Sequence, residues 1–392
     1  MTDRSSLRNV ILVTGGTGYI GSHISAHFMS LGYNVVSIDN YSNSKSQFAN
    51  LSRLRAREGW GGRFIELSVE LTDSFESVKK KIQRNFAIYK YSIDQIFAVI
   101  HCAAKKSVKL SATQALDYYH TNLTSLTNVC KLVQDFAVPT LVFSSSACLY
   151  TGVCENPSDK VHTETEAYKF KETDLDVTSG VAIMPTTVYG RTKFMGERIL
   201  HDISQSDGWC SRIVILRYFN PINEHPSGCI REDPNAETPE NLMPVLIKVA
   251  NGDLQKLQIF GIDYDETPDG TCMRDFIHIM DLSEAHSAVL GIRKADPAIP
   301  SETGDASDTG DANANKSNWA GPVETYNVGT NVGYTVKQVV DTFMKVNELQ
   351  FQVEVTDRRR GDVAVLCANC DKIMCAFNWK ATRGLEDMVK IR

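Results

Sequence analysis

Long apolar segments are missing from this chain of 392 residues. No run of apolar residues approaches the roughly 18 that a helix needs to span a bilayer. The first eight residues are polar and lead directly into the strand-like run Val10-Ile-Leu-Val13, without the apolar stretch and cleavage site of a secretory signal. The sequence therefore predicts a cytoplasmic protein with no membrane partner.

An excess of basic charge is missing as well. The 41 lysines and arginines are outnumbered by 47 aspartates and glutamates, which gives a formal net charge of −6. A chain of that charge has no general electrostatic attraction for nucleic acid, so we expect no nucleic-acid partner. With 42% hydrophobic and 22% charged residues the composition is that of a globular protein, and the length suggests two domains.

Metal-binding patterns are also missing, although the chain contains ten cysteines. Without a signal peptide these cysteines belong in a reducing compartment. Cys367 and Cys370 form a CxxC pair, but no second pair stands at zinc-finger spacing from it. His23 and His27 are four residues apart, with no evident third ligand. We therefore expect no metal site and interpret both pairs as incidental packing or surface residues.

Strand-like and helix-like segments alternate regularly in the first half of the chain. Short apolar runs stand at residues 10–13, 35–38, 63–67, 96–100 and 140–143, and helix-like segments end near residue 31 or cover about 73–89 and 116–136. Strands that alternate with helices form a parallel sheet covered on both faces. The sequence therefore predicts an α/β fold with a doubly wound parallel sheet.

Two polar stretches interrupt this alternation. Residues 151–185 are polar and acidic without a clear period, and we interpret them as a long surface loop. Residues 295–322 include a low-complexity tract of glycine, aspartate, alanine, serine and asparagine. Because this tract has too few apolar residues to offset the entropy of ordering it, we expect a mobile insertion.

A glycine motif follows the first strand-like run. Gly15, Gly18 and Gly21 have the spacing that permits a tight strand-to-helix turn, at which backbone amides and the helix N-terminus receive a pyrophosphate. Asp39 stands 18 residues beyond Gly21, at the end of the second strand, where a carboxylate can accept hydrogen bonds from the ribose hydroxyls of NAD. The same carboxylate would repel a 2′-phosphate. We therefore predict a Rossmann-like NAD site.

A second motif joins a tyrosine to a lysine. Tyr189 and Lys193 are four residues apart in a helix-like segment, so both side chains share one face. The ammonium favours the phenolate and is expected to lower the pKa of the tyrosine. This spacing is common by chance, but here it follows the nucleotide motif and a serine run that ends at Ser146. A serine hydroxyl there can bond the substrate oxygen that the tyrosine deprotonates.

Together these motifs resemble the extended short-chain dehydrogenase/reductase family, and within it the UDP-galactose 4-epimerases. Further matching segments are 39–45, 99–101, 118–119, 216–221, 225–228, 232–234, 241–244, 269–271, 274–278, 280–282, 326–329 and 358–362. The resemblance covers nearly the whole chain apart from the two insertions. It implies a Rossmann-like NAD-binding domain over residues 1–219 and a smaller mixed α/β UDP-sugar-binding domain over residues 220–392.

The resemblance also implies an activity, the interconversion of UDP-glucose and UDP-galactose with NAD that stays bound. Tyr189 then removes the proton of the sugar 4-hydroxyl, Lys193 holds the nicotinamide ribose, and Ser146 bonds the 4-oxygen. Hydride leaves sugar C4, the 4-keto sugar turns over, and hydride returns to the opposite face. The implied cofactor positions are Gly15, Gly18, Tyr19, Ile20, Asp39, Asn40, Asn43, Ser44, Lys106, Asn122, Lys193 and Tyr218. The implied UDP-sugar positions are Ser146, Tyr189, Asn220, Asn241, Leu242, Phe260, Arg274, Arg359, Asp362 and Leu366.

Several positions depart from the family pattern. Ser68 replaces an acid that holds the adenine amine, Ala104 replaces a glycine, and Lys105 adds a charge beside Lys106. Lys109 and Leu110 replace Gly-Glu, Asn223 and Glu224 replace Gly-Ala, Arg231 replaces a glycine, and the usual aromatic C-terminal helix has no counterpart before Arg392. These departures bear on cofactor affinity and turnover more than on fold.

Leu366 aligns with a residue that walls the pocket beside the sugar 2-substituent. In the family a tyrosine there excludes N-acetyl groups, and a cysteine or glycine admits them. Leucine has intermediate bulk, so we expect UDP-N-acetylhexosamines to react poorly but detectably.

Two alternatives remain. Sugar-nucleotide 4,6-dehydratases share these motifs but need an Asp-Glu pair after the serine run, where this chain has Ala147-Cys148. The chain is otherwise a catalytically weak sensor or scaffold that binds NAD or UDP-sugar. Family members pair two helices with a partner's two, which suggests a homodimer.

Overall fold

The structure, a computed structural model, describes residues 8–154, 169–179, 184–232, 241–292, 323–359 and 361–391. Its elements are β1 (Val10–Thr14), α1 (Tyr19–Ser30), β2 (Asn34–Asp39), α2 (Phe48–Glu58), β3 (Phe64–Ser68), α3 (Phe75–Ile88), β4 (Ile96–His101), α4 (Val108–Thr113), α5 (Ala115–Asp135), β5 (Thr140–Ser146), α6 (Thr151–Cys154), β6 (Lys169–Phe170), α7 (Val188–Ser204), β7 (Arg212–Tyr218), β8 (Asn220–Ile222), α8 (Leu242–Ala250), β9 (Lys256–Phe260), β10 (Met273–His278), α9 (Ile279–Val289), β11 (Val323–Val328), β12 (Gly333–Thr335), α10 (Val336–Val346), β13 (Gln352–Thr356), β14 (Val365–Ala368), α11 (Asp371–Phe377) and α12 (Leu385–Val389). The predicted insertion at 295–322 lies outside the described residues. None of the described helices is both long and apolar enough to cross a membrane.

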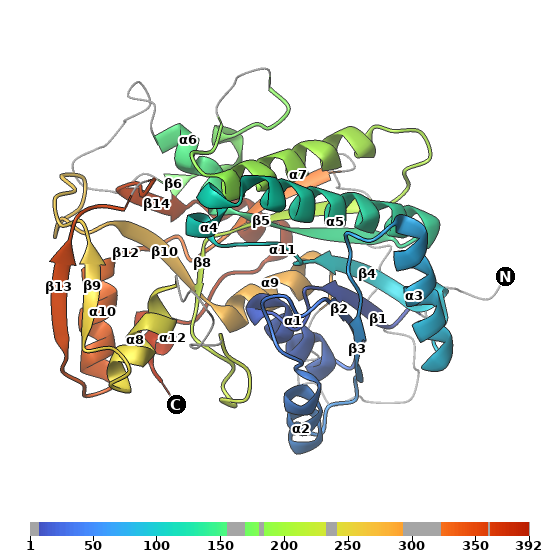
Figure 1. The fold of residues 1–392 in the computed structure, drawn as a ribbon, viewed down its shortest axis with the longest axis horizontal. Coiled ribbons are helices and arrows are strands. Elements are labelled where there is room, and N and C mark those ends of the chain that lie inside the picture. The colour runs from blue at the N-terminus through green and yellow to red at the C-terminus, as the bar shows by residue number, and fades with distance from the viewer. Residues whose placement is uncertain are drawn as a thin grey trace.

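Seven parallel strands form the central sheet, in the order β11-β7-β5-β4-β1-β2-β3. Helices cover both faces: α5 and α7 lie side by side on one, and α1 and α9 on the other (Figure 1). The predicted doubly wound parallel sheet is confirmed. The strand order reverses between β1 and β4, which is the place where such sheets bind ligands at the carboxyl ends of their strands.

The side chains of the sheet alternate between two hydrophobic cores. On β1, Ile11 and Val13 join the core under α1 and α9, whereas Val10 and Leu12 join the core under α3 and α5. This alternation is the two-residue period of a strand buried on both faces. The apolar period of α3 that the sequence indicated is also present, since Val78, Ile82 and Phe86 are its buried residues. Each core thus fixes the strand ends that carry the candidate site.

A smaller mixed sheet and its helices form the second part of the molecule. Strands β12, β10, β14 and β6 are joined in that order, β8 also pairs with β10, and β9 pairs with β13. Helices α8, α10 and α12 lie beside them around a separate apolar core (Figure 1). Because β11 joins the large sheet from beyond residue 220, the second half of the chain contributes to both parts. The division at residue 220 stays a prediction.

The interpretation of residues 151–185 as a surface loop is wrong for the part that the structure describes. Strand β6 pairs in parallel with β14, and Phe170 is buried and stacks on Tyr150 with ring centroids 5.0 Å apart. The Glu172 carboxylate accepts a hydrogen bond from the Asn327 amide. One aromatic residue in a polar stretch gives no periodic signal, so the sequence hid this strand. Residues 155–168 and 180–183 lie outside the described residues.

A buried ion pair connects this segment to the central sheet. Arg217 on β7 donates to both carboxylate oxygens of Glu197 on α7, at 2.7 Å for the shortest contact. It also donates to the Tyr150 hydroxyl and to the carbonyls of Glu172 and Leu175. The side chain of Glu197 is completely buried. A buried charge is tolerated only when it is paired and hydrogen-bonded, and this pair meets that condition.

We expect Arg217→Met to lower the free energy of unfolding by about 3–5 kcal/mol, because it leaves the Glu197 carboxylate buried without a cation. Urea denaturation followed by circular dichroism measures this change. Arg57→Met is the matched control, since Arg57 pairs with Glu58 at 2.8 Å on the surface. Such an exposed pair contributes less than about 1 kcal/mol. Equal effects of the two substitutions would contradict the prediction.

Candidate active site

The glycine turn lies at the point where the strand order reverses. Gly15 has φ +67°, and a Cβ there would lie 2.8 Å from the amide nitrogen of Ala103, in the loop after β4. A Cβ at Gly21 would lie 2.1 Å from the Gly15 carbonyl oxygen. Gly18 is the N-cap of α1, whose first turn carries no acidic residue. The turn therefore leaves a cradle of backbone next to a helix N-terminus, which fits the pyrophosphate of a dinucleotide.

Asp39 ends β2 at the side of this cradle. Its carboxylate accepts from the backbone amides of Thr17 and Tyr41, at 3.2 and 2.9 Å, and from the Ser44 hydroxyl at 3.3 Å. It is 7% exposed, so it is fixed by the turn around it. The structure therefore brings Asp39 and Ser44 together as the sequence predicted, whereas Asn43 is exposed.

A second carboxylate lies near this end of the site. Asn40 donates to Glu70 at 2.7 Å, and the hydroxyl and amide of Thr72 also donate to Glu70. Sequence reasoning noted only that Ser68 lacks the family's acid. Because Glu70 is two residues further along, alignment of motifs gave no signal for it.

Asn122 on α5 holds the loop after β4. Its carbonyl accepts from the backbone amide of Lys105 at 2.8 Å, and its amide donates to the Lys105 carbonyl at 3.1 Å and to the Thr192 hydroxyl at 2.9 Å. One side chain thus connects the loop to α7. The contacts use only backbone atoms of Lys105, whose own ammonium pairs with Asp117. Ala104 does not have a positive φ, so the glycine that it replaces is not required there.

Tyr189 and Lys193 lie on the buried face of α7, as predicted. The three serines at the end of β5 meet this face one by one. The Lys193 ammonium donates to the Ser144 carbonyl at 2.6 Å, and the Ser145 hydroxyl donates to the carboxylate of Glu197. The Ser146 hydroxyl is hydrogen-bonded to the Tyr189 phenol.

A missing side chain allows α7 to approach this closely. A Cβ at Gly190 would lie 2.8 Å from Pro185 and 3.1 Å from the Cys148 carbonyl oxygen. A Cβ at Gly196 would lie 2.9 Å from the ring of Phe143 on β5. The two glycines therefore permit the contact between helix and strand on which the Tyr189–Ser146 pair depends.

Burial dominates the protonation of both residues in the protein alone. It lowers the pKa of the Lys193 ammonium to about 8. It raises the pKa of the Tyr189 phenol, and the Ser146 hydrogen bond acts in the opposite direction. The expectation of a net lowered pKa for Tyr189 is therefore wrong for the protein by itself, because transfer of the phenolate out of water costs more than its neighbours return.

Two other tyrosines near this face are held by their hydroxyl groups. Tyr218, opposite Ser146 across the β5–β7 pair, is hydrogen-bonded to His286 at 2.7 Å. His286 also bonds the Leu282 carbonyl through Nδ1, so its Nε2 accepts from the phenol. Tyr150 is fully buried and donates to Asn327. Tyr150 therefore belongs to the core.

The predicted diphosphate-binding residues also lie together. Arg274 on β10 and Arg359 both pair with Asp362, at 3.7 and 3.2 Å. The Arg359 guanidinium lies over the Phe260 ring, 4.6 Å from its centroid. Leu366 stands opposite Arg274 in the β10–β14 pair and is 5% exposed. Two arginines beside one carboxylate provide fork-shaped donors for a diphosphate.

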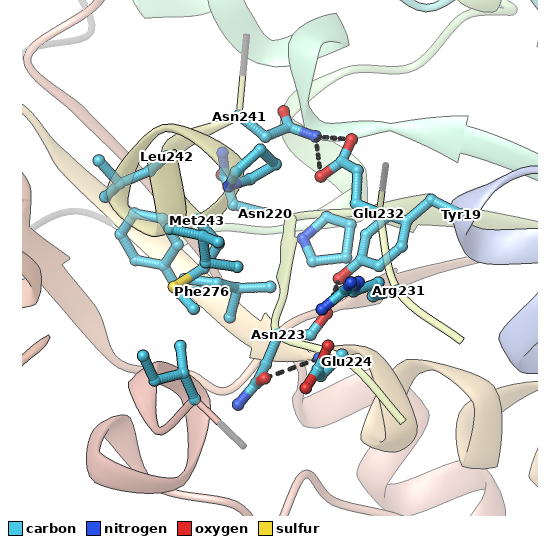
Figure 2. A pocket seen from close by; sticks show the side chains of 15 residues that line it. Tyr19, Asn220, Asn223, Glu224, Arg231, Glu232, Asn241, Leu242, Met243 and Phe276 are labelled. Carbon is cyan, nitrogen blue, oxygen red and sulfur yellow. Dashed lines mark hydrogen bonds between the residues drawn. The ribbon is translucent and has the colours of Figure 1, made fainter. Parts of the chain in front are cut away.

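A pocket opens between α1, β8 and α8. Tyr19, Asn220, Asn241 and Leu242, all predicted site residues, are among those that line it (Figure 2). Glu232, which the sequence did not assign, also lines it and accepts from the Asn241 amide. Isolated acids in loops carry no motif, so only the folded chain identifies this carboxylate.

Asn223 shows how one departure is accommodated. Its φ is +75°, which glycine adopts freely and asparagine tolerates better than other side chains. Its amide donates to the carbonyls of Asp387, in α12, and of Lys390, and its own carbonyl accepts from the Tyr19 hydroxyl at 2.7 Å. The asparagine therefore attaches the segment around α12 to the start of α1.

We predict that Lys193→Met raises the free energy of unfolding by about 1–3 kcal/mol at pH 7, since the folded protein then no longer buries a charge. The folded pKa of Lys193, about 8, lies below its ordinary value of 10.5. The unfolded chain therefore holds this proton more tightly, and the cost to the wild type disappears as the pH rises from 8 to 10.5.

Urea denaturation of both proteins between pH 7 and 10 measures the difference, which should shrink across that range. A variant less stable than the wild type at pH 7, or a difference independent of pH, would contradict the prediction.

Comparison with known proteins follows this geometry. The model of the NAD dependent epimerase/dehydratase family matches residues 11–299. The UDP-glucose 4-epimerase of Bacillus subtilis is 36% identical over 378 residues, which cover 96% of this chain and 94% of that protein. The solved UDP-glucose 4-epimerase of Bifidobacterium longum, in complex with NAD+ and UDP, is similar with a TM-score of 0.73 and 32% identity over 97% of this chain and 96% of that one.

A further solved structure has a wider substrate description. The UDP-Glc/GlcNAc 4-epimerase of Campylobacter jejuni is similar with a TM-score of 0.66 and 30% identity, over 97% of this chain and 98% of that one. The resemblance indicated by the sequence motifs is confirmed: this chain belongs to the NAD dependent epimerase/dehydratase family.

Proposed function

We propose that this chain is an NAD-dependent UDP-glucose 4-epimerase that interconverts UDP-glucose and UDP-galactose. The observation that carries the proposal is the contact of Tyr189 and Lys193 with the serines of β5, beside a glycine cradle that only a dinucleotide phosphate explains. Asn122 joins the two halves of this arrangement. The similar epimerases described above support the same activity.

In this proposal Tyr189 moves the proton. Its phenolate oxygen takes the proton of the sugar 4-hydroxyl, while Ser146 hydrogen-bonds the same oxygen atom. Lys193 is protonated below its pKa of about 8 and favours the phenolate. Bound NAD supplies the hydride acceptor at sugar C4 and the hydride that returns to the other face. The same phenol then gives its proton back, so no proton is released overall.

The cofactor residues are assigned from their positions. The amides at Gly15, Gly18, Tyr19 and Ile20 would hold the pyrophosphate at the N-terminus of α1. Asp39 would accept from the adenosine ribose, with Asn40, Asn43 and Ser44 beside it; Lys106, Asn122 and Lys193 would lie toward the nicotinamide end, with Tyr218. We assign Glu70 the place of the missing acid at Ser68, because Asn40 already donates to it.

The UDP-sugar residues fall into two groups. Arg274 and Arg359 would bind the diphosphate as cationic forks, in exchange for their present partner Asp362. Phe260 would contact the uracil, and Leu366 would wall the hexose. Asn220, Asn241 and Leu242 line the pocket and would contact the sugar and its phosphate.

We expect Tyr189→Phe to lower kcat for UDP-galactose by a factor of about 10³, because general base catalysis is lost while the ring remains. A coupled assay of UDP-glucose formation measures this change. Tyr89→Phe, at a tyrosine 46% exposed, is the control and should keep wild-type turnover. Wild-type protein that binds NAD and UDP-glucose without interconverting them would favour a sensor or scaffold instead.

Substrate range depends on Leu366 in this proposal. We expect UDP-N-acetylglucosamine to be epimerised at a rate on the order of one hundredth of that of UDP-glucose, since a leucine leaves less room than a smaller side chain. Leu366→Cys should raise the ratio of the two rates about tenfold. Equal rates for both substrates in the wild type, or no detectable reaction of the acetylated one, would contradict this.

We also propose a cytoplasmic homodimer. The family pairs two helices with those of a partner, and α5 and α7 lie side by side here (Figure 1). Leu116, on α5, is an apolar side chain that is 87% exposed. A partner's helix pair would cover it.

A further inference from the structure

The carboxylate of Glu232 joins two residues from opposite sides of the site. Its Oε1 accepts from the Lys106 ammonium at 2.7 Å and from the Asn241 amide at 2.7 Å, and its Oε2 accepts from the same amide at 3.0 Å. Lys106 belongs to the loop after β4, and Asn241 is the N-cap of α8. The bridge therefore connects a residue beside the large sheet to one at the smaller part (Figure 2).

The orientation of Asn241 follows from this bridge. An ionised carboxylate only accepts hydrogen bonds, so the amide nitrogen must face Glu232 and the carbonyl oxygen must face away from it. Figure 2 shows this arrangement at the wall of the pocket. An N-cap asparagine ordinarily accepts from the first turn of its helix, and Asn241 makes no such hydrogen bond. Its side chain is engaged by Glu232 instead.

The bridge is also placed where it can act on ligand binding. Glu232 is 19% exposed on its side chain, whereas Lys106 is 53% exposed. The Lys106 ammonium lies 5.8 Å from the centroid of the Tyr19 ring, which lines the same pocket. An ammonium has three donors, of which Glu232 takes one, so Lys106 keeps donors for a ligand while its position is fixed.

We propose that Glu232 is a positioning residue of the epimerase site, which fixes the Lys106 ammonium and the Asn241 amide so that Asn241 presents its carbonyl oxygen to a hydroxyl donor of the UDP-hexose. The inference rests on the proposed function. Glu232 itself need not touch the substrate. It removes the two-fold freedom of the amide and so lowers the entropy cost of binding.

The test is Glu232→Gln. Glutamine keeps the size but offers one acceptor and a donor, so the Asn241 amide is free to reverse and Lys106 loses its charged partner. We expect KM for UDP-galactose to rise about tenfold while kcat changes less than about threefold, because the lost contact orders the site without acting on the proton. Glu232→Asp, which keeps an acceptor-only group, should recover part of the loss.

The matched control is Glu354→Gln. Glu354 also bonds one lysine and one amide, Lys256 at 2.6 Å and Gln258 at 3.2 Å, but on the exposed β9–β13 pair. It should leave KM unchanged. In the double variant with Asn241→Ala, Glu232→Gln should add little, since its effect acts through that amide. Full additivity, or a wild-type KM in Glu232→Gln, would overturn the inference.

Calorimetric titration with UDP-glucose separates this inference from the proposed function. If the wild type and Glu354→Gln turn over UDP-galactose and Glu232→Gln keeps the wild-type KM, only the inference fails. If none of the proteins turns over, the proposed function fails and the dissociation constants decide. A tenfold weaker constant for Glu232→Gln supports the positioning role, and an equal constant overturns it.

Discussion

The burial of one face of α7 is the constraint on which the rest of the site depends. Tyr189, Lys193 and Glu197 are spaced four residues apart on that face, and each brings an ionisable group against the end of β5. Burial is unfavourable for all three unless each finds a partner. The three consecutive serines of β5 supply those partners, one carbonyl and two hydroxyls, in the order of the strand.

The partners are not equivalent, and the difference assigns their roles. Glu197 is completely buried and fully compensated by Arg217, so it anchors the helix and does not titrate at neutral pH. Lys193 has only a neutral carbonyl, and burial lowers its pKa to about 8. Tyr189, nearest the N-terminus of α7, is only partly buried. The helix thus goes from a fixed charge in the core to a reactive group at its exposed end.

Much of the fold followed from the sequence because its signals are local. Alternating apolar runs, glycine spacing and the four-residue interval of Tyr189 and Lys193 each depend on neighbouring residues. What the sequence missed depends on distant residues: Arg217 meets Glu197, Glu232 meets Lys106 over 126 positions, and β6 pairs with β14. No local period carries such contacts. The departures at Ala104 and Lys105 likewise became neutral only once their backbone contacts were seen.

The cations of the site are already paired in the protein alone. Lys106 is held by Glu232, and Arg274 and Arg359 share Asp362. A polyanionic ligand therefore does not meet bare charges but exchanges with carboxylates that have kept these side chains in place. Such partly exposed ion pairs are weak, so their exchange costs little, while the geometry they impose is kept. Because the carboxylates come from loops on different sides of the pocket, they also bring the two parts of the molecule to one binding geometry before the ligand arrives.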